Sequence, residues 1–350
     1  MNHSTLAART AGPLPRLRLI LFVLLMLAGT AVRGQSFTVS SIQPVNGSIG
    51  TVTSDASGTT TYTISAATGA TTRKSGSGLP VNATGTRALV TIGCTGNGNS
   101  CGGANGSTVS ATVKLTPAGT PSGRALALTN FNAAPGDVAP SATQGSGASF
   151  QFTVTGNFRN GATHNFYIGA DFPIASTGTT GTASSDYLIT VSGAGNPSGS
   201  TATGSFAANV RRPISISRAS HLAFGTVVRP TTGSNTIAID ATSGTRSMAG
   251  GGNAALRSST TSRAQFTVTG ESGQAFDITA LPATVTMTSP GGGSIPVTLS
   301  RTHTNPVSIS GGSTSAAGTV TIGVGGSFTI TSTTPTGAYS ATFPITVTYN

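Results

Sequence analysis

The sequence has 350 residues, of which 48 are glycine and only 7% are charged, and its formal net charge is +11. Four of the 18 basic residues lie in an N-terminal segment that we expect to be removed, which leaves 14 basic and 7 acidic residues, a net charge of 14 − 7 = +7. These charges are thinly spread, whereas a phosphate-binding face needs clustered lysine or arginine, so the composition argues against nucleic-acid binding. Glutamate and lysine are scarce, while threonine, valine, isoleucine and phenylalanine recur in short alternating runs, which predicts an all-β protein.

The first 34 residues have the composition of a signal peptide. Residues 1–18 carry three arginines and no acid, and residues 19–28 (LILFVLLMLA) form an apolar run followed by small residues. This run is well short of the ~20 residues that a membrane-spanning helix needs. We expect cleavage after Gly34 or near Ala31, and export of the remaining chain to the periplasm, cell surface or exterior of a bacterial cell.

Two cysteines, Cys94 and Cys101, bracket the turn-forming run TGNGNS that follows a strand-like segment. No histidine lies nearby to complete a metal site, and an exported protein meets an oxidising environment. We therefore predict a disulfide between them. So small a loop stabilises the fold by only about 2 kcal/mol.

Segments of the first half of the chain align without gaps with segments of the second half, both near the start and near the end of each half. Residues 168–192 match residues 324–348, with Phe172 on Phe328, an offset of 328 − 172 = 156. Residues 49–69 match residues 224–244, an offset of 224 − 49 = 175. Because apolar positions keep step with turn glycines in both comparisons, we predict two tandem copies of one β domain.

Each half holds short alternating strands separated by turn signals such as Asn46-Gly47 and Asn160-Gly161. This density of strands predicts immunoglobulin-like Greek-key β-sandwiches, with a barrel as the second choice. The predicted organisation is a signal peptide over 1–34, a first sandwich over 35–200, a linker or shared strand over 201–212, and a second sandwich over 213–350. Within the joint, residues 201–210 are either linker or the last strand of the first domain.

Groups suited to catalysis are few. The chain after residue 34 has seven acids and three histidines, without HExxH, paired-histidine or calcium-loop spacing. His164 lies beside the segment NFYIG and could approach Asp171 or Asp186 in space. The segment GNSCG around Ser100 fits G-x-S-x-G but lacks the strand-to-helix turn of a hydrolase. We predict no enzymatic activity, no metal site and no cofactor.

The C-terminal half carries a resemblance to a known family. Its segments RPISISRASHLAFGTV, RAQFTVTGESGQAFDITALP, IGVGGSFTI and PTGAYSATFPITVTYN resemble exported proteobacterial domains of unknown function. That family is related to spore coat protein U and to the pilins of chaperone–usher fimbriae. The most specific feature is the end of the chain, where Tyr349 is penultimate and Gly337 is fourteenth from the C-terminus (350 − 337 + 1 = 14). The match covers residues 212–350, with a weaker copy in the first half.

The resemblance implies a sandwich that lacks one strand. A periplasmic chaperone would supply the missing strand and hold the last strand of the domain, and a neighbouring subunit would later replace it. The strand-pairing residues implied in this sequence are Gly337, Phe343, Ile345, Val347 and Tyr349. The segment at Gln35 serves as a first strand and leaves no spare donor strand, so such a subunit would stand at a fibre tip or cap.

Two functions follow from these observations. The first is a non-enzymatic cell-surface subunit, structural or adhesive, that assembles through β-strand pairing. The alternative is a secreted, self-contained binding module for glycan or another extracellular ligand, in which residues 341–350 are the last strand of a complete sandwich. A final strand with an alternating apolar face and a free edge would be an aggregation hazard unless another strand pairs with it. Both alternatives bury the same apolar face of this strand, so the sequence does not separate them.

Overall fold

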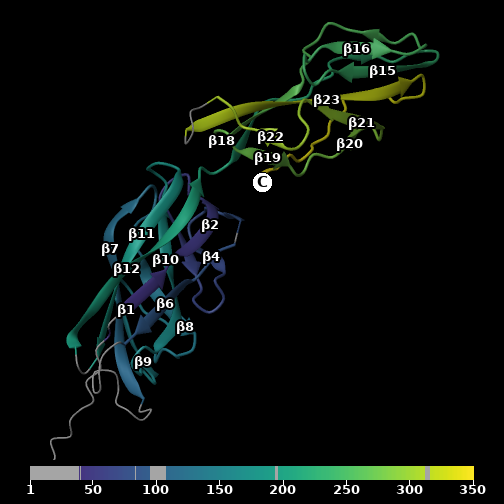
Figure 1. The fold of residues 1–350 in the computed structure, drawn as a ribbon. Coiled ribbons are helices and arrows are strands. Elements are labelled where there is room, and N and C mark those ends of the chain that lie inside the picture. Colours follow the sequence, from purple (N-terminus) through teal and green to yellow (C-terminus); the bar gives the residue numbers. More distant parts are fainter. Residues whose placement is uncertain (1–38, 40, 83, 95–107, 194–195, 312–315) are drawn as a thin grey trace, which may run out of the picture.

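A computed structural model describes residue 39 and residues 41–82, 84–94, 108–193, 196–311 and 316–350. Every regular element in these residues is a β-strand, and the strands form two lobes that meet at the end of a long strand (Figure 1). The predicted signal peptide lies outside the described residues and stays a prediction. No helix in the described part of the chain is long and apolar enough to cross a membrane.

The first sheet of the first domain has the strand order β1-β6-β10-β3-β4, and β8 also pairs with β10. Its strands are β1 (Ser41–Val45), β3 (Thr59–Ile64), β4 (Thr71–Ser75), β6 (Ala88–Gly93), β8 (Thr129–Pro135) and β10 (Thr163–Ala175). All pairs in this sheet are antiparallel. Most of the first strand expected from Gln35 lies outside the described residues and stays a prediction; β1 begins at Ser41, and Val39 before it is buried in the core.

The second sheet of the first domain has the order β5-β2-β12-β11-β7-β9. Its strands are β2 (Gly47–Thr53), β5 (Pro80–Asn82), β7 (Val109–Ser122), β9 (Phe150–Gly156), β11 (Gly181–Gly193) and β12 (Asn196–Arg211). The last of them, β12, runs antiparallel to β11 and parallel to β2. Residues 201–210, for which the sequence left a linker or a strand open, lie within β12.

The two sheets enclose one continuous core, because each strand turns alternate residues inward. In β9, for example, Phe150, Phe152 and Val154 are buried while the residues between them are not. The large side chains that the core buries completely are Tyr62, Phe131, Phe158, Phe166, Phe172, Tyr187 and Phe206. The first domain is a closed β-sandwich.

The main sheet of the second domain has the order β13-β18-β23-β15-β16, with β21 pairing β23 and β20 pairing β21. Its strands are β13 (Ser215–Ser220), β15 (Ser234–Ile239), β16 (Arg246–Ala249), β18 (Ala264–Glu271), β20 (Thr284–Thr288), β21 (Ser294–Arg301) and β23 (Ala317–Thr331). The facing layer is split into a pair, β14-β17, and a triplet, β22-β19-β24. These strands are β14 (Val227–Val228), β17 (Ala255–Leu256), β19 (Ala275–Ile278), β22 (Val307–Ser308) and β24 (Val347–Tyr349).

The two domains share one topology. The order β1-β6-β10-β3-β4 with β8 on β10 recurs as β13-β18-β23-β15-β16 with β21 on β23. In the facing layer, β5-β2 recurs as β17-β14, and β11-β7-β9 recurs as β24-β19-β22. The chain is thus all-β, with two tandem immunoglobulin-like Greek-key sandwiches. Descent of both from one duplicated domain, and the domain boundaries given above, stay predictions.

Local geometry matches at the offset of 175 read from the sequence. Gly50 and Gly225 both have positive φ, 84° and 71°, as do Gly69 and Gly244, at 76° and 74°. Both members of the second pair close the same five-residue turn, in which the glycine N–H donates to the carbonyl four residues earlier. Each residue of β2 therefore has a defined counterpart in or before β14, 175 positions later in the chain.

Candidate functional site: a strand-sized groove in the second domain

In the described residues, the facing layer of the second domain has one strand fewer between its walls than that of the first domain. In the first domain β12 lies between β2 and β11 and pairs with both. The corresponding strands of the second domain, β14 and β24, have no strand between them among the described residues. The core beneath is also divided into two clusters, which share only the half-buried Leu222 and Leu299.

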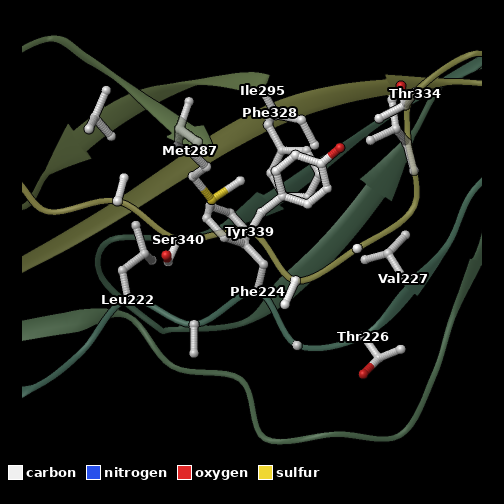
Figure 2. Close-up of a pocket in the computed structure, with 18 of the residues that line it drawn as sticks. Leu222, Phe224, Thr226, Val227, Met287, Ile295, Phe328, Thr334, Tyr339 and Ser340 are labelled. Carbon is white, nitrogen blue, oxygen red and sulfur yellow. The ribbon is translucent and has the colours of Figure 1, made fainter. Parts of the chain in front are cut away.

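A groove of about 760 Å³ occupies the place of the missing strand. One wall is the segment 221–229 that contains β14, and the other is the segment 334–341 together with Phe343. Its floor is made of apolar side chains, namely Phe224, Val285, Met287, Ile295, Val297, Phe328 and Ile330. Figure 2 shows the ring of Tyr339 among Phe224, Met287, Ile295 and Phe328. The groove is thus apolar at its base and bounded by backbone on both sides.

The rings at the base of the groove hold one another in place. Phe224 and Phe328 meet edge to face, with ring centroids 4.8 Å apart at 86°, an arrangement that stabilises an aromatic pair. The Tyr339 hydroxyl donates to the Pro335 carbonyl oxygen at 2.7 Å, so its polar end is directed back to its own segment. The ring of Tyr339 is left as an apolar surface of the groove.

The second wall, followed along the chain to residue 346, has its inner edge paired and its outer edge open. Ser340 exchanges two backbone hydrogen bonds with Thr288, and the Thr346 carbonyl accepts from Thr279 N–H. Ala341, Phe343 and Ile345 have no backbone hydrogen-bond partner among the described residues. Their first-domain counterparts, Ser185, Tyr187 and Ile189, all pair with β12. An open edge of this kind is a template for strand addition.

The final strand is shorter than the sequence suggested. The alternation from Phe343 onward predicts a strand along the whole segment, but β24 includes only Val347–Tyr349. In the first domain the matching strand is regular over Gly181–Gly193, where it has neighbours on both sides. The missing neighbour on the outer side is the physical reason for the difference, because a strand with one partner makes half the ladder hydrogen bonds.

The structure brings the five predicted strand-pairing residues to this wall and its continuation. Gly337 and Phe343 line the groove, and Phe343 also packs on Phe266, with ring centroids 6.3 Å apart. Ile345 is half-buried against the core, and Val347 is buried opposite Ile278. Tyr349 pairs with Phe276 at the far end of β24. That these residues bind a partner strand stays a prediction.

Sequence reasoning missed the opposite wall. Leu222, Phe224 and Val227 line the groove from β14 and the residues before it. They lie in the segment HLAFGTV, whose last four residues the sequence analysis matched to residues 49–52. That match alone does not mark these residues as neighbours of a missing strand, because the place of the strand depends on pairings between distant segments.

Tyr349 links the end of β24 to the joint between the domains. Its hydroxyl accepts a hydrogen bond from Glu271 N–H at 2.7 Å. The guanidinium of Arg211, the last residue of β12, lies 5.6 Å from the Tyr349 ring centroid and donates to the Asn350 backbone oxygen at 3.3 Å. Burial raises the pKa of the Tyr349 phenol, so the ring stays neutral. The end of the chain is therefore held from within the same molecule.

We expect Tyr349→Phe to lower the free energy of unfolding of the second domain by about 1 kcal/mol, because Glu271 N–H loses its partner. Thermal or denaturant unfolding would measure the change. Tyr339→Phe is the matched control, since its hydroxyl makes an exposed bond to Pro335 O and its loss is expected to cost less. Equal effects of the two changes would contradict the role given to Tyr349.

The remaining predicted sites have mixed outcomes. Cys94 is buried at the end of β6, but Cys101 and Ser100 lie outside the described residues, so the disulfide stays a prediction. The acid beside His164 is Asp137, with Nδ1 and Oδ2 3.4 Å apart, and not Asp171 or Asp186. Asp171 instead binds Lys74 on β4 at 2.5 Å. Within the described ranges, no three histidine, cysteine, aspartate or glutamate side chains gather in a way that could hold a metal ion.

Comparisons with known proteins find two kinds of similarity. A family model described as a domain of unknown function (DUF4402) matches residues 214–349. A search of curated proteins finds no match. These residues are the second domain, the one that carries the groove.

Among solved structures, the chain is similar to a chain of the CsuC–CsuE chaperone–tip adhesion subunit pre-assembly complex from archaic chaperone-usher Csu pili of Acinetobacter baumannii. The identity is 13%, the match covers 73% of this chain and 88% of that chain, and the TM-score is 0.22. It is also similar to a chain of a chaperone–tip adhesin complex of CFA/I fimbriae, at 10% identity, 87% and 96% coverage and a TM-score of 0.22. The relation to spore coat protein U stays a prediction.

Proposed function

We propose that this protein is a non-enzymatic, exported structural or adhesive subunit of the pilin type, and that it assembles by accepting a β-strand into the groove of its second domain. The observation that carries the proposal is the difference between the two sandwiches. Apart from β20 on β21, which is found only in the second domain, the two sandwiches share their strand pairings except those of β12, and the place of β12 is a groove in the second domain. The first domain, which has its β12, needs no outside strand.

The geometry of β12 specifies how the occupant would bind. It would run antiparallel to residues 337–347 and parallel to β14, as β12 does relative to β11 and β2. Its backbone would pair with the open edge at Ala341, Phe343 and Ile345, and alternate side chains would cover Phe224 and Phe328. Backbone pairing of this kind gives affinity, and the side-chain positions give specificity. In the exported protein the donors would be a periplasmic chaperone and then a neighbouring subunit.

A subunit with one closed and one open sandwich suits the end of a fibre. The closed first domain would be free to present a surface, while the open second domain would receive the strand of the next subunit. This arrangement would place the protein at the tip or cap of a surface fibre. The alternative is a secreted binding module whose groove takes a glycan or another extracellular ligand directly.

A strand appended in cis would test the proposal. A short turn and a strand with apolar residues at alternate positions would be fused after Asn350, as β12 follows β11 in the first domain. We expect the unfolding temperature of the second domain to rise on the order of 10 °C. The control strand has the same residues shifted by one position, which turns every apolar side chain to solvent.

Equal unfolding temperatures for the two fusions would refute strand addition. If neither fusion changes the second domain but small apolar or saccharide ligands do, the binding-module alternative takes its place.

A further inference from the structure

We infer that the groove selects against the pattern of β12 itself and accepts a strand with a smaller side chain where β12 carries Phe206. The occupant is then a strand of a different polypeptide, and not the β12 strand of a second copy of this chain. This inference rests on the proposed function, because it specifies the partner of the same groove. The residues that surround β12 in the first domain differ from those that line the groove in the second domain.

Four side chains of β12 face the core of the first domain, namely Gly204, Phe206, Ala208 and Val210. Opposite them on β11 stand Tyr187, Ser185, Ala183 and Gly181, in that order. On the other side, β2 places Gly47 beside Phe206, Gly50 beside Ala208 and Val52 beside Val210. The positions of Phe206, Ala208 and Val210 are therefore each bounded by one residue of each neighbouring strand, and the position of Gly204 by Tyr187 of β11.

The counterparts in the second domain are fixed by geometry on both walls. Gly50 and Gly225 share positive φ values, so Gly47, three residues before the first, corresponds to Leu222, three before the second. On the other wall, Ser184 pairs with Ser122 as Ser340 pairs with Thr288. The neighbouring residue Ser185 therefore corresponds to Ala341.

The two domains differ at the position of Phe206. Its ring fills the space above Gly47 so closely that a Cβ atom on residue 47 would lie 2.2 Å from Phe206 Cε1. In the second domain Leu222 stands at this place, lines the groove and packs against both core clusters. A phenylalanine of the occupant would overlap the Leu222 side chain. Overpacking of this kind destabilises a packed site, so this position calls for alanine or valine.

The next position toward the C-terminal end of the occupant is also restricted. Ala208 sits between Ala183 and Gly50 in the first domain. The corresponding pair in the second domain is Tyr339 and Gly225, and Figure 2 shows the Tyr339 ring in the groove. A small residue leaves room for that ring, so alanine or glycine is expected here.

The other two positions are unchanged in character. Gly204 lies against Tyr187, where a Cβ would be 2.3 Å from the hydroxyl oxygen, and Phe343 takes the place of Tyr187. Val210 lies beside Val52, whose counterpart is Val227. The strand that binds in the groove is thus expected to carry, at successive core-facing positions, glycine, then alanine or valine, then a small residue, then valine.

Two synthetic peptides added to the full-length mature protein test this selectivity. One copies residues 200–211 (STATGSFAANVR), and the other is the same peptide with Phe206→Val. We expect the valine peptide to bind at least about tenfold more tightly, because the phenylalanine overlaps Leu222. Isothermal titration calorimetry measures both affinities, and a peptide with the core-facing residues shifted by one position is the negative control.

A compensating change in the protein makes the test specific to Leu222. In the Leu222→Gly protein, which restores the glycine of the first domain, the copy of residues 200–211 is expected to bind as tightly as the valine peptide or more tightly. Leu222→Ala provides a milder variant if the glycine protein unfolds. Equal affinities of the two peptides for the unaltered protein would overturn the selectivity and leave strand addition standing. Failure of every peptide, together with failure of the appended strand, would overturn the proposed function itself.

Discussion

Replacing Phe206 by alanine is expected to lower the free energy of unfolding of the first domain by about 3–5 kcal/mol, the cost of truncating a buried phenylalanine. Phe206 is 1% exposed and is the largest side chain that β12 contributes to the core. Its ring lies 5.5 Å from that of Tyr187 and covers Gly47. The change leaves a cavity between β2 and β11, which β12 joins.

Denaturant unfolding followed by a probe in each domain would measure this loss. The matched control is Phe343→Ala in the second domain. Phe343 stands where the partner strand is missing and is only half-buried, so its truncation is expected to cost less. If Phe206→Ala leaves the first domain as stable as before, then β12 does not complete that sandwich, and the comparison on which the groove is built fails.

Glu271→Ala is expected to lower the free energy of unfolding by about 2–3 kcal/mol and to loosen the joint between the domains. Glu271 is the only glutamate in the sequence and lies at the end of β18, where it is 4% exposed. One carboxylate oxygen accepts from Thr180 Oγ1 at 2.6 Å, and the other accepts from Arg212 N–H at 3.2 Å and lies 3.6 Å from Arg212 Nε. It therefore connects both domains to the segment between them.

Removing Glu271 also leaves positive charge without its compensation. Arg124 is buried nearby, and its pKa is lowered by burial and by Arg212, while Glu271 acts in the opposite direction. A buried cation that loses its anion is strongly destabilising. Because Arg212 is one-third exposed, solvent screens part of that effect.

Limited trypsin digestion reports on the joint directly, since Arg211-Arg212 is a cleavable pair at its centre. We expect faster cleavage there in the Glu271→Ala protein. Glu271→Gln keeps a hydrogen-bonding oxygen but no charge, so it separates the two contributions and is expected to fall between. An unchanged cleavage rate and an unchanged unfolding transition in the alanine protein would show that the carboxylate does not hold the joint.

Local structure could be predicted from the residues alone. Alternating threonine, valine, isoleucine and phenylalanine with few helix formers fixed an all-β chain, because such side chains pack well on a pleated surface. Turn glycines that keep step at offsets of 156 and 175 marked corresponding elements in the two halves. The final segment with Phe343 and Tyr349 could be predicted to need a partner strand, because an alternating apolar strand with a free edge must pair with something.

Which strands each domain has among the described residues could not be predicted, and it emerges from the folded chain. β12 completes the first sandwich by pairing in parallel with β2, about 160 residues earlier in the chain, and no local pattern encodes that contact. The absence of the equivalent strand beside β14, the shortness of β24 and the role of Leu222 follow from it. Local sequence sets what a segment can form, but hydrogen-bond partners across a sheet come from distant segments, so the groove appears only when the whole chain is folded.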